Sequence, residues 1–482
     1  MTNLGLNLFI ILKQVIVMRE EEDLIGTKEL DDEAYYGIHT ARAQENFNLT
    51  GRRVNRHLIK AIVEIKKAAA VVNYEIDRLE EEKKDAIVGA CEEVLAGGLE
   101  DEFKLDALQG GAGTSTNMMV NEILANRAIE ILGGSKGDYE IIHPNQDVNL
   151  GQSTNDVYPT ALKLASLRLL IPLTEEVAAL QEALQDKERE FANILKLGRT
   201  QLQDAVPITL GQEFSAYAEA ISRDRWRLYK VSERLKKVNL GGTAVGTGLN
   251  AAPKFIFKVV KELRRSTDVT LAHAENMIDN TQNLDVFVEV SGLLKSLAVN
   301  LNKIANDLRL LSSGPKGGIG EIKLPQVQPG SSIMPGKINP VIPEAVNQLS
   351  FLVTSNDQAI TLAAQSGQLE LNAMLPLLAD KFLESLETLA NGVQMFREKC
   401  IVGIEAKEER CRELLDDSLG LLTALNPYLG YKLTTEIAKE VLASEKTVKE
   451  AVLEREVFTA EELEDILSPQ EMTKPGIVGK NI

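Results

Sequence analysis

The chain has 482 residues, enough for about three domains of ordinary size. Its 53 lysines and arginines are outnumbered by 71 aspartates and glutamates, and the net charge of −18 argues against a surface that binds nucleic acid or anionic membranes. The hydrophobic share of 44% and the charged share of 26% argue against extensive disorder.

Histidine and cysteine are scarce, which restricts the available chemistry. The four histidines show no metal-ligand spacing and the three cysteines form no C-x-x-C motif, so no metal site is expected. Neither a G-x-G-x-x-G dinucleotide motif nor a P-loop motif occurs. An enzyme of this composition is expected to require no cofactor, and the odd, scattered cysteines are typical of the reducing cytoplasm.

Residues 1–17 are apolar but fit neither a signal peptide nor a membrane anchor. The run has no basic residue at its start, is interrupted at Lys13 and Gln14, and is too short to span a bilayer. We therefore expect a dispensable N-terminal extension, with Met18 as the functional start, and a cytoplasmic protein without a membrane segment.

The rest of the chain divides into three regions by pattern. Residues 18–155 show short helical patterns separated by many turn residues, which predicts an N-terminal helical domain. Residues 156–409 show long periodicities and predict a central bundle of long helices. Residues 410–482 predict a small C-terminal helical domain with a capping signature at Thr459 and Glu462.

Apolar residues of the central region recur in steps of three and four, which is typical of long helices that pack side by side. The three clearest stripes are Phe214, Tyr217, Ile221, Leu228, Val231, Leu235 and Val238; Leu294, Leu297, Leu301, Ile304, Leu308 and Leu311; and Val346, Leu349, Val353, Ile360 and Ala363. Asp224 and Asn356 fall on two of these seams. They either fix the register of an oligomer or are tolerated polar positions in an intrachain core.

Two further helices are expected at residues 160–196 and 368–396, the second kinked at Pro376. Strands are expected to be few and short, at residues 324–327 and just before Thr209. The predicted fold class is therefore mainly α.

A glycine- and proline-rich segment at residues 312–340 separates two predicted long helices. A loop of this length is usually functional or disordered. It contains GSSIMPGKINP, in which the Ser331 hydroxyl could be surrounded by backbone N–H groups and act as a base near the Lys337 ammonium. Lys337 and Asn339 could together hold a carboxylate. The alternative is a disordered linker that happens to contain these residues.

Three other polar clusters share a theme. GGAGTSTN at residues 110–117 and QSTND at residues 152–156 precede helical patterns, and GRTQLQD spans residues 198–204. Each cluster alone is more typical of a helix cap than of a binding site. Together they predict a pocket for a small anionic ligand rich in oxygen acceptors.

The loop sequence resembles the G-S-S-x-M-P-x-K-x-N signature of the fumarase/aspartase superfamily, and the chain is similar to its aspartate ammonia-lyase branch. The similarity extends from Gly26 to Gly476 and includes GTKELDDEAYYGIHT, GGAGTSTN, GQSTNDVYPT, GRTQLQDAVP, NDLRLLSSGP and ALNPYLGY. The resemblance implies a three-domain subunit whose long helices form a twenty-helix core in a homotetramer. It also implies active sites assembled from three subunits around a small dicarboxylate substrate.

The family reaction removes a Cβ proton anti to a leaving group and produces fumarate. By resemblance, Ser331 is the base, with the adjacent Ser332 as the alternative. The resemblance assigns the β-carboxylate to Thr114, Ser153 and Thr154, the α-carboxylate to Lys337 and Asn339, and the amino group to Asn155, Thr200 and Gln201. The implied activity is the reversible deamination of L-aspartate to fumarate and ammonia.

A class II fumarase is the alternative within the family. Fumarases have a histidine at the position of Gln201, paired with a glutamate that matches Glu344, and an amide cannot shuttle that proton. Thr154, the NPVIPEAVNQ segment and the MTKPG ending also resemble aspartases. A catalytically silent structural relative is the other alternative, and loss of Ser331 or Lys337 would have indicated it.

His143 matches a secondary anion site of fumarases, but Asp147 stands where a second histidine often occurs. A turn fixed by Pro144 is the favoured interpretation of this segment. Activation by Mg²⁺ is known in the family, and no carboxylate cluster in the sequence identifies a site for it.

Overall fold

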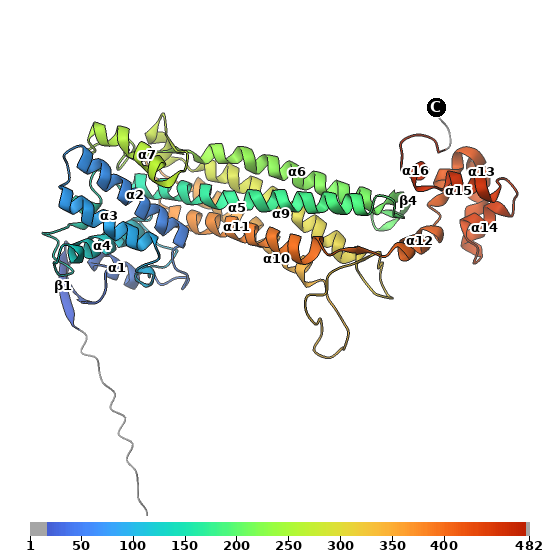
Figure 1. Ribbon diagram of the computed structural model, residues 1–482, viewed down its shortest axis with the longest axis horizontal. Helices are drawn as coiled ribbons and strands as arrows, with labels where there is room; N and C mark the ends of the chain where they lie inside the picture. Colours follow the sequence, from blue (N-terminus) through green and yellow to red (C-terminus); the bar gives the residue numbers. More distant parts are fainter. Residues whose placement is uncertain (1–16, 479–482) are drawn as a thin grey trace, which may run out of the picture. The chain divides into compact units, whose positions relative to one another are not determined.

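The computed structural model describes residues 17–478 and is mainly helical, which confirms the predicted fold class (Figure 1). The described chain forms two compact units. The first unit contains residues 17–168, 232–289 and 358–384, and the second contains residues 169–231, 290–357 and 385–478. The predicted division at residues 155 and 409 stays a prediction. The predicted extension lies outside the described residues except for Val17, whose carbonyl accepts a hydrogen bond from Asp32 N–H at 2.9 Å.

Short helices and small sheets make up most of the first unit. Its strands are β1 (Met18–Asp23), β2 (Gly26–Asp31), β5 (Lys237–Val238) and β6 (Ala272–His273). Its short and medium helices are α1 (Ile38–Asn46), α2 (Arg56–Glu75), α3 (Glu81–Leu95), α4 (Thr114–Ile131), α7 (Pro253–Thr267) and α8 (Met277–Gln282). β1 and β2 form an antiparallel hairpin, and α2 packs against both α3 and α7. The central position of α2 places its side chains near several loops of the unit.

The described residues include five long helices: α5 (Thr154–Glu190), α6 (Leu210–Leu235), α9 (Asp285–Leu311), α10 (Val341–Gln365) and α11 (Leu375–Phe396) (Figure 1). The second unit adds the strands β3 (Leu195–Thr200), β4 (Gln203–Thr209), β7 (Ile322–Lys323) and β8 (Glu405–Ala406). It ends in α12 (Glu408–Asp416), α13 (Leu421–Ala443), α14 (Val448–Leu453), α15 (Ala460–Ile466) and α16 (Pro469–Met472). The predicted capping signature is present, since Thr459 and Glu462 form a reciprocal capping box at α15.

The three predicted stripes are buried along their whole length, which confirms the periodicity argument. The two polar seam residues are partnered inside the second unit. Asp224 Oδ2 accepts a hydrogen bond from Asn300 Nδ2 at 2.7 Å, and Asn356 Nδ2 donates to Ser385 Oγ at 3.1 Å. Both polar seam residues therefore have hydrogen-bond partners within the chain, and a role in fixing the register of an oligomer stays a prediction.

Three local expectations are wrong, and one hairpin was not expected. The helix expected to reach residue 196 ends at Glu190, because the chain turns into the hairpin β3–β4. Residues 324–327 form no strand, and β7 lies just before them. The helix expected from residue 368 begins at Leu375, so Pro376 is its second residue and produces no kink, because the N–H groups of the first helical turn have no partner within the helix. The hairpin β1–β2 was not expected.

All three cysteines are free and buried. Burial raises the pKa of the Cys91, Cys400 and Cys411 thiols to about 12 in each case. Within residues 17–478, no helix has the length and apolar character needed to cross a membrane.

Candidate active site

A tight turn at residues 153–156 starts α5 and carries three of the predicted site residues. The Ser153 hydroxyl accepts a hydrogen bond from Asn155 N–H at 3.2 Å, and the Asp156 carboxylate accepts one from Ser153 N–H at 3.0 Å. These bonds cap the helix. The Ser153 oxygen receives an N–H, so its own hydrogen is free to be donated to a ligand.

Hydrogen bonds hold a glycine-rich turn at residues 241–250 against this turn. Asp156 Oδ2 accepts hydrogen bonds from Gly241 N–H at 3.0 Å and Thr243 N–H at 2.9 Å. Asn155 Nδ2 donates to Ala244 O at 2.7 Å. Burial raises the pKa of Asp156 to about 6, against the lowering effect of these backbone N–H groups. The Asn155 amide nitrogen thus donates one hydrogen bond within the protein. No role for the glycine-rich turn was predicted from the sequence.

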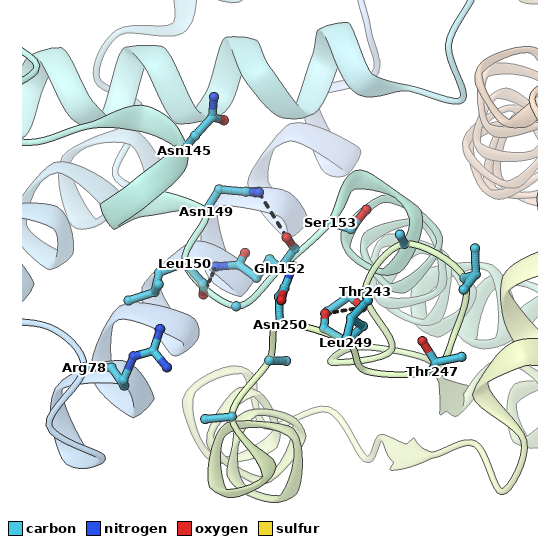
Figure 2. Close-up of a pocket in the computed structure, with 15 residues that line it drawn as sticks. Arg78, Asn145, Asn149, Leu150, Gln152, Ser153, Thr243, Thr247, Leu249 and Asn250 are labelled. Carbon is cyan, nitrogen blue, oxygen red and sulfur yellow. Dashed lines mark hydrogen bonds between the residues drawn. The ribbon is translucent and has the colours of Figure 1, made fainter.

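The two turns border a cavity of about 760 Å³ (Figure 2). Its lining includes Ser153, Thr243, Thr247 and Asn250, and Arg78 is the one charged residue among those that line it. Neutral donors with a single cation suit a small anion that carries several oxygen acceptors. Of the predicted site residues, Ser153 alone is among those that line this cavity, so the predicted pocket formed by all three clusters stays a prediction.

Thr154 and Thr114 lie in the first turns of two helices that touch. Thr154 is buried, and its Oγ1 accepts a hydrogen bond from Asn117 Nδ2 of α4 at 3.2 Å. Thr114 is the first residue of α4 and follows Gly113, which has a φ of +89°. A Cβ at Gly113 would come within 2.3 Å of the Tyr158 ring on α5, so only glycine allows this close approach.

The third predicted cluster forms a β-hairpin in the second unit. Thr200 ends β3, and Gln201 and Leu202 form the turn with φ values of +56° and +62°. Both Thr200 and Gln201 are exposed at the tip. Next to this tip, Arg199 Nη1 lies 2.9 Å from the fully buried Glu321 Oε1. An ion pair with a buried carboxylate therefore holds the hairpin directly beside its polar tip.

The serine loop is closed at its neck by two hydrogen bonds. Gly330 N–H donates to Lys337 O at 2.8 Å, and Asn339 Nδ2 donates to Gly330 O at 2.7 Å. Inside the loop, Ser331 Oγ accepts from Ile333 N–H at 3.2 Å and Met334 N–H at 3.0 Å. Two N–H dipoles favour negative charge on this oxygen.

Ser332 and Lys337 are exposed on the same loop. Among residues 17–478, no hydrogen bond to the Ser332 side chain is found. The two serines therefore differ in environment, although their catalytic roles stay predictions. Asn339 uses part of its amide to close the loop, and Glu344 lies half-buried in the first turn of α10.

His143 has a structural role in the first unit. Its Nδ1 accepts hydrogen bonds from Asn145 N–H at 3.0 Å and Gln146 N–H at 3.3 Å. The backbone N–H of His143 donates to Asp147 Oδ2 at 2.7 Å, and Asp147 pairs with Lys83 Nζ at 3.0 Å. These contacts fix the turn at Pro144, in agreement with the favoured interpretation.

Within the described part of the chain, no group of three or more histidine, cysteine, aspartate or glutamate residues could hold a metal ion.

The first unit brings together Ser153, Thr154 and Asn155 and links them to α4, which carries Thr114. The second unit carries Thr200, Gln201, Ser331, Ser332, Lys337, Asn339 and Glu344.

Comparison with known proteins shows the family to which the chain belongs. Residues 26–355 match the family model described as lyase, and residues 421–474 match the model described as fumarase C C-terminus. The long-helix fold with its polar turns and serine loop is that of a lyase, and the chain belongs to the lyase family.

Its individual relatives narrow the class. The chain is 48% identical to the aspartate ammonia-lyase of Bacillus subtilis (strain 168), over 96% of this chain and 98% of the relative. A structure of fumarate lyase:delta crystallin from Brucella melitensis bound to cobalt superposes with a TM-score of 0.91 at 48% identity, over 95% of this chain and 100% of that one. The recombinant class II fumarase from Schistosoma mansoni gives a TM-score of 0.89 at 35% identity, over 95% of this chain and 100% of that one.

Proposed function

We propose that the chain catalyses the reversible deamination of L-aspartate to fumarate and ammonia. The observation that carries this proposal is the 48% identity to an aspartate ammonia-lyase over nearly the full length of both chains. The class II fumarase compared above is 35% identical, and Gln201 stands where a fumarase needs a proton-shuttling histidine.

In this reaction a base removes a Cβ proton of aspartate, and the electron pair moves into the β-carboxylate to give a dianionic intermediate. Ser331 takes the proton, and the two backbone N–H groups that donate hydrogen bonds to its Oγ favour negative charge on this oxygen. The hydroxyls of Thr114, Ser153 and Thr154 stabilise the growing charge on the β-carboxylate.

The elimination is completed when the electron pair returns to form the Cα–Cβ double bond and the Cα–N bond breaks. The nitrogen leaves already protonated, so no general acid is required at Gln201. Lys337 and Asn339 hold the α-carboxylate during both steps by charge and hydrogen bonding. Asn155, Thr200 and Gln201 orient the amino group.

The same proposal includes a homotetramer in which three subunits contribute to each site. Large apolar side chains of the second unit support it, since Trp226 and Tyr229 of α6, Val299 of α9 and Phe351 of α10 are 57–68% exposed in the single chain. A second copy that covers them would remove a large apolar surface from water. We also propose a cytoplasmic location, which the three free cysteines support.

The direct test is a substrate comparison with enzyme dialysed against EDTA. We expect fumarate to form from L-aspartate, measured by its ultraviolet absorbance, with much weaker activity on L-asparagine and none on L-malate. Retained activity after dialysis is expected because no metal is required. Turnover of L-malate without turnover of L-aspartate would contradict the proposal and favour the fumarase alternative. Inactivity on both substrates would favour the structural relative.

A further inference from the structure

A buried lysine lies beneath the turn that starts α5. Lys66 of α2 is 0% exposed. Its Nζ donates hydrogen bonds to Asn149 Oδ1 at 2.7 Å and to Gln152 Oε1 at 3.0 Å. Asn73, two turns further along α2, donates its Nδ2 to Leu150 O at 2.9 Å. One face of α2 therefore holds the loop that immediately precedes Ser153.

The contact with Lys66 fixes which way the neighbouring amides point. A lysine ammonium has three donors and no acceptor, so Asn149 and Gln152 must turn their oxygens toward it. Their amide nitrogens then face other carbonyls. Asn149 Nδ2 donates to Gln152 O at 3.2 Å and Gln152 Nε2 to Leu150 O at 3.3 Å, as the dashed lines in Figure 2 show.

The orientation of the Asn149 amide determines that of Asn117 on α4, and Asn117 in turn contacts Thr154. Because Asn149 presents an oxygen, Asn117 must present its amide nitrogen, and the distance from Asn117 Nδ2 to Asn149 Oδ1 is 3.2 Å. The same nitrogen donates to Thr154 Oγ1 at 3.2 Å. With its oxygen occupied by a donor, the Thr154 hydroxyl has its own hydrogen free for an acceptor elsewhere.

We propose that Lys66 is a positioning residue which, through Asn149 and Asn117, holds the Thr154 hydroxyl as a donor toward the substrate carboxylate. This inference rests on the proposed function, because that function supplies the carboxylate. The buried Asp156 faces Lys66 from α5 and supports the charge of the ammonium. Burial lowers the pKa of Lys66 to about 7, yet the neutral amine keeps two N–H groups for the two oxygens it contacts.

The first test replaces Lys66 by methionine, which has similar length and no donor. We expect kcat/KM for L-aspartate to fall about tenfold or more, because the variant loses both hydrogen bonds of the Lys66 side chain and the loss of even one such bond at a buried site can have an effect of this size. The inhibition constant of succinate, a competitor with the same two carboxylates, should rise in parallel. Lys163→Met is the matched control, since Lys163 is buried in the same unit but donates to Lys237 O and Asn280 Oδ1.

The second test reverses one link without removing the lysine. Asn117→Asp replaces the donor by an acceptor of the same shape, so the Thr154 hydroxyl would turn inward, and kcat/KM should fall by a comparable factor. Asn121→Asp is its control, because Asn121 is equally buried on α4 and donates its Nδ2 to Met118 Sδ instead of Thr154. In a double-mutant cycle, Thr154→Val should cost much less in the Lys66→Met background than in the Lys163→Met background.

Circular dichroism and light scattering establish that each variant is folded and assembled. Should Lys66→Met or Asn117→Asp not fold, Asn149→Ser provides the test, since it breaks the link and leaves the lysine in place. Folded variants with the kcat/KM of their controls, or additive effects in the cycle, would overturn the inference. An inactive wild type would contradict the proposed function instead, so the two failures are distinguishable.

Discussion

Ser331 and Ser332 are adjacent residues with the same side chain, but the loop gives them different surroundings. Ser331 Oγ receives two backbone N–H groups, whereas Ser332 is exposed. Ser331→Ala should therefore lower kcat by several orders of magnitude with little change in succinate binding, because only the proton-abstracting group is lost. Ser332→Ala is the matched control and should keep most of the activity. Steady-state kinetics on both variants checks this, and a large loss in Ser332→Ala alone would exchange their roles.

Site residues that belong to a sequence motif could be predicted from the sequence. Residues that hold those site residues in place through tertiary contacts could not. Ser153, Thr154 and Ser331 stand in recognisable polar clusters. Lys66 stands next to Lys67 in an ordinary lysine pair, yet only Lys66 is buried, while Lys67 pairs with Glu92. The available signal was the helical spacing that puts Lys66 on the same face as Ile62 and Asn73. Its partners come from distant loops, which no local pattern indicates.

At the level of elements, the loop that leads into α4 depends on a single carboxylate. Asp106 accepts hydrogen bonds from the backbone N–H groups of Thr50, Gly51 and Leu108, at 2.6, 2.9 and 2.8 Å. Its own carbonyl accepts from Gln109, whose side-chain oxygen holds Thr116 N–H of α4. The first turn of α4, which carries Thr114, is thus tied to Asp106.

This arrangement predicts a stability that depends on pH. Burial alone would raise the pKa of Asp106, but the hydrogen bonds outweigh it and lower the pKa to about 2, from 3.8. A depressed carboxyl pKa stabilises the fold above pH 4, and this contribution is lost as the pH falls toward 2. At pH 6, Asp106→Asn should reduce the free energy of unfolding by about 2 kcal/mol.

Urea denaturation followed by circular dichroism, at pH 6 and at successively lower pH, measures this effect. The difference between wild type and Asp106→Asn should shrink below about pH 4. A difference that stays constant with pH would show that the hydrogen bonds act equally on the protonated acid.

The long helices and the long loop were predictable because their patterns are periodic and extended. The stripe ending at Leu311 and the start of α10 at Val341 bracket the predicted loop within a residue. The hairpin β3–β4 was not predictable in the same way. Its turn uses Gln201 and Leu202 at positive φ, without the glycine or asparagine that normally indicates such a turn.

At the scale of the whole molecule, the proposed shared site can be tested by mixing inactive variants. Ser331→Ala and Thr154→Val should each be nearly inactive alone. If different subunits supply these residues to one site, randomly mixed tetramers should recover about a quarter of the wild-type activity, because each residue is intact in half of the chains. Activity of co-refolded mixtures measures this, and no recovery in mixed tetramers verified by mass spectrometry would contradict shared sites.

The buried thiols have a practical consequence. With pKa values of about 12, Cys91, Cys400 and Cys411 carry almost no thiolate at neutral pH and are shielded from reagents. The unmodified chain should therefore react little with thiol-directed labels. A single cysteine placed at Ile333, which is 84% exposed beside Ser331, would accept a maleimide fluorophore selectively. Such a probe would report the motion of the serine loop during turnover without removal of any native cysteine.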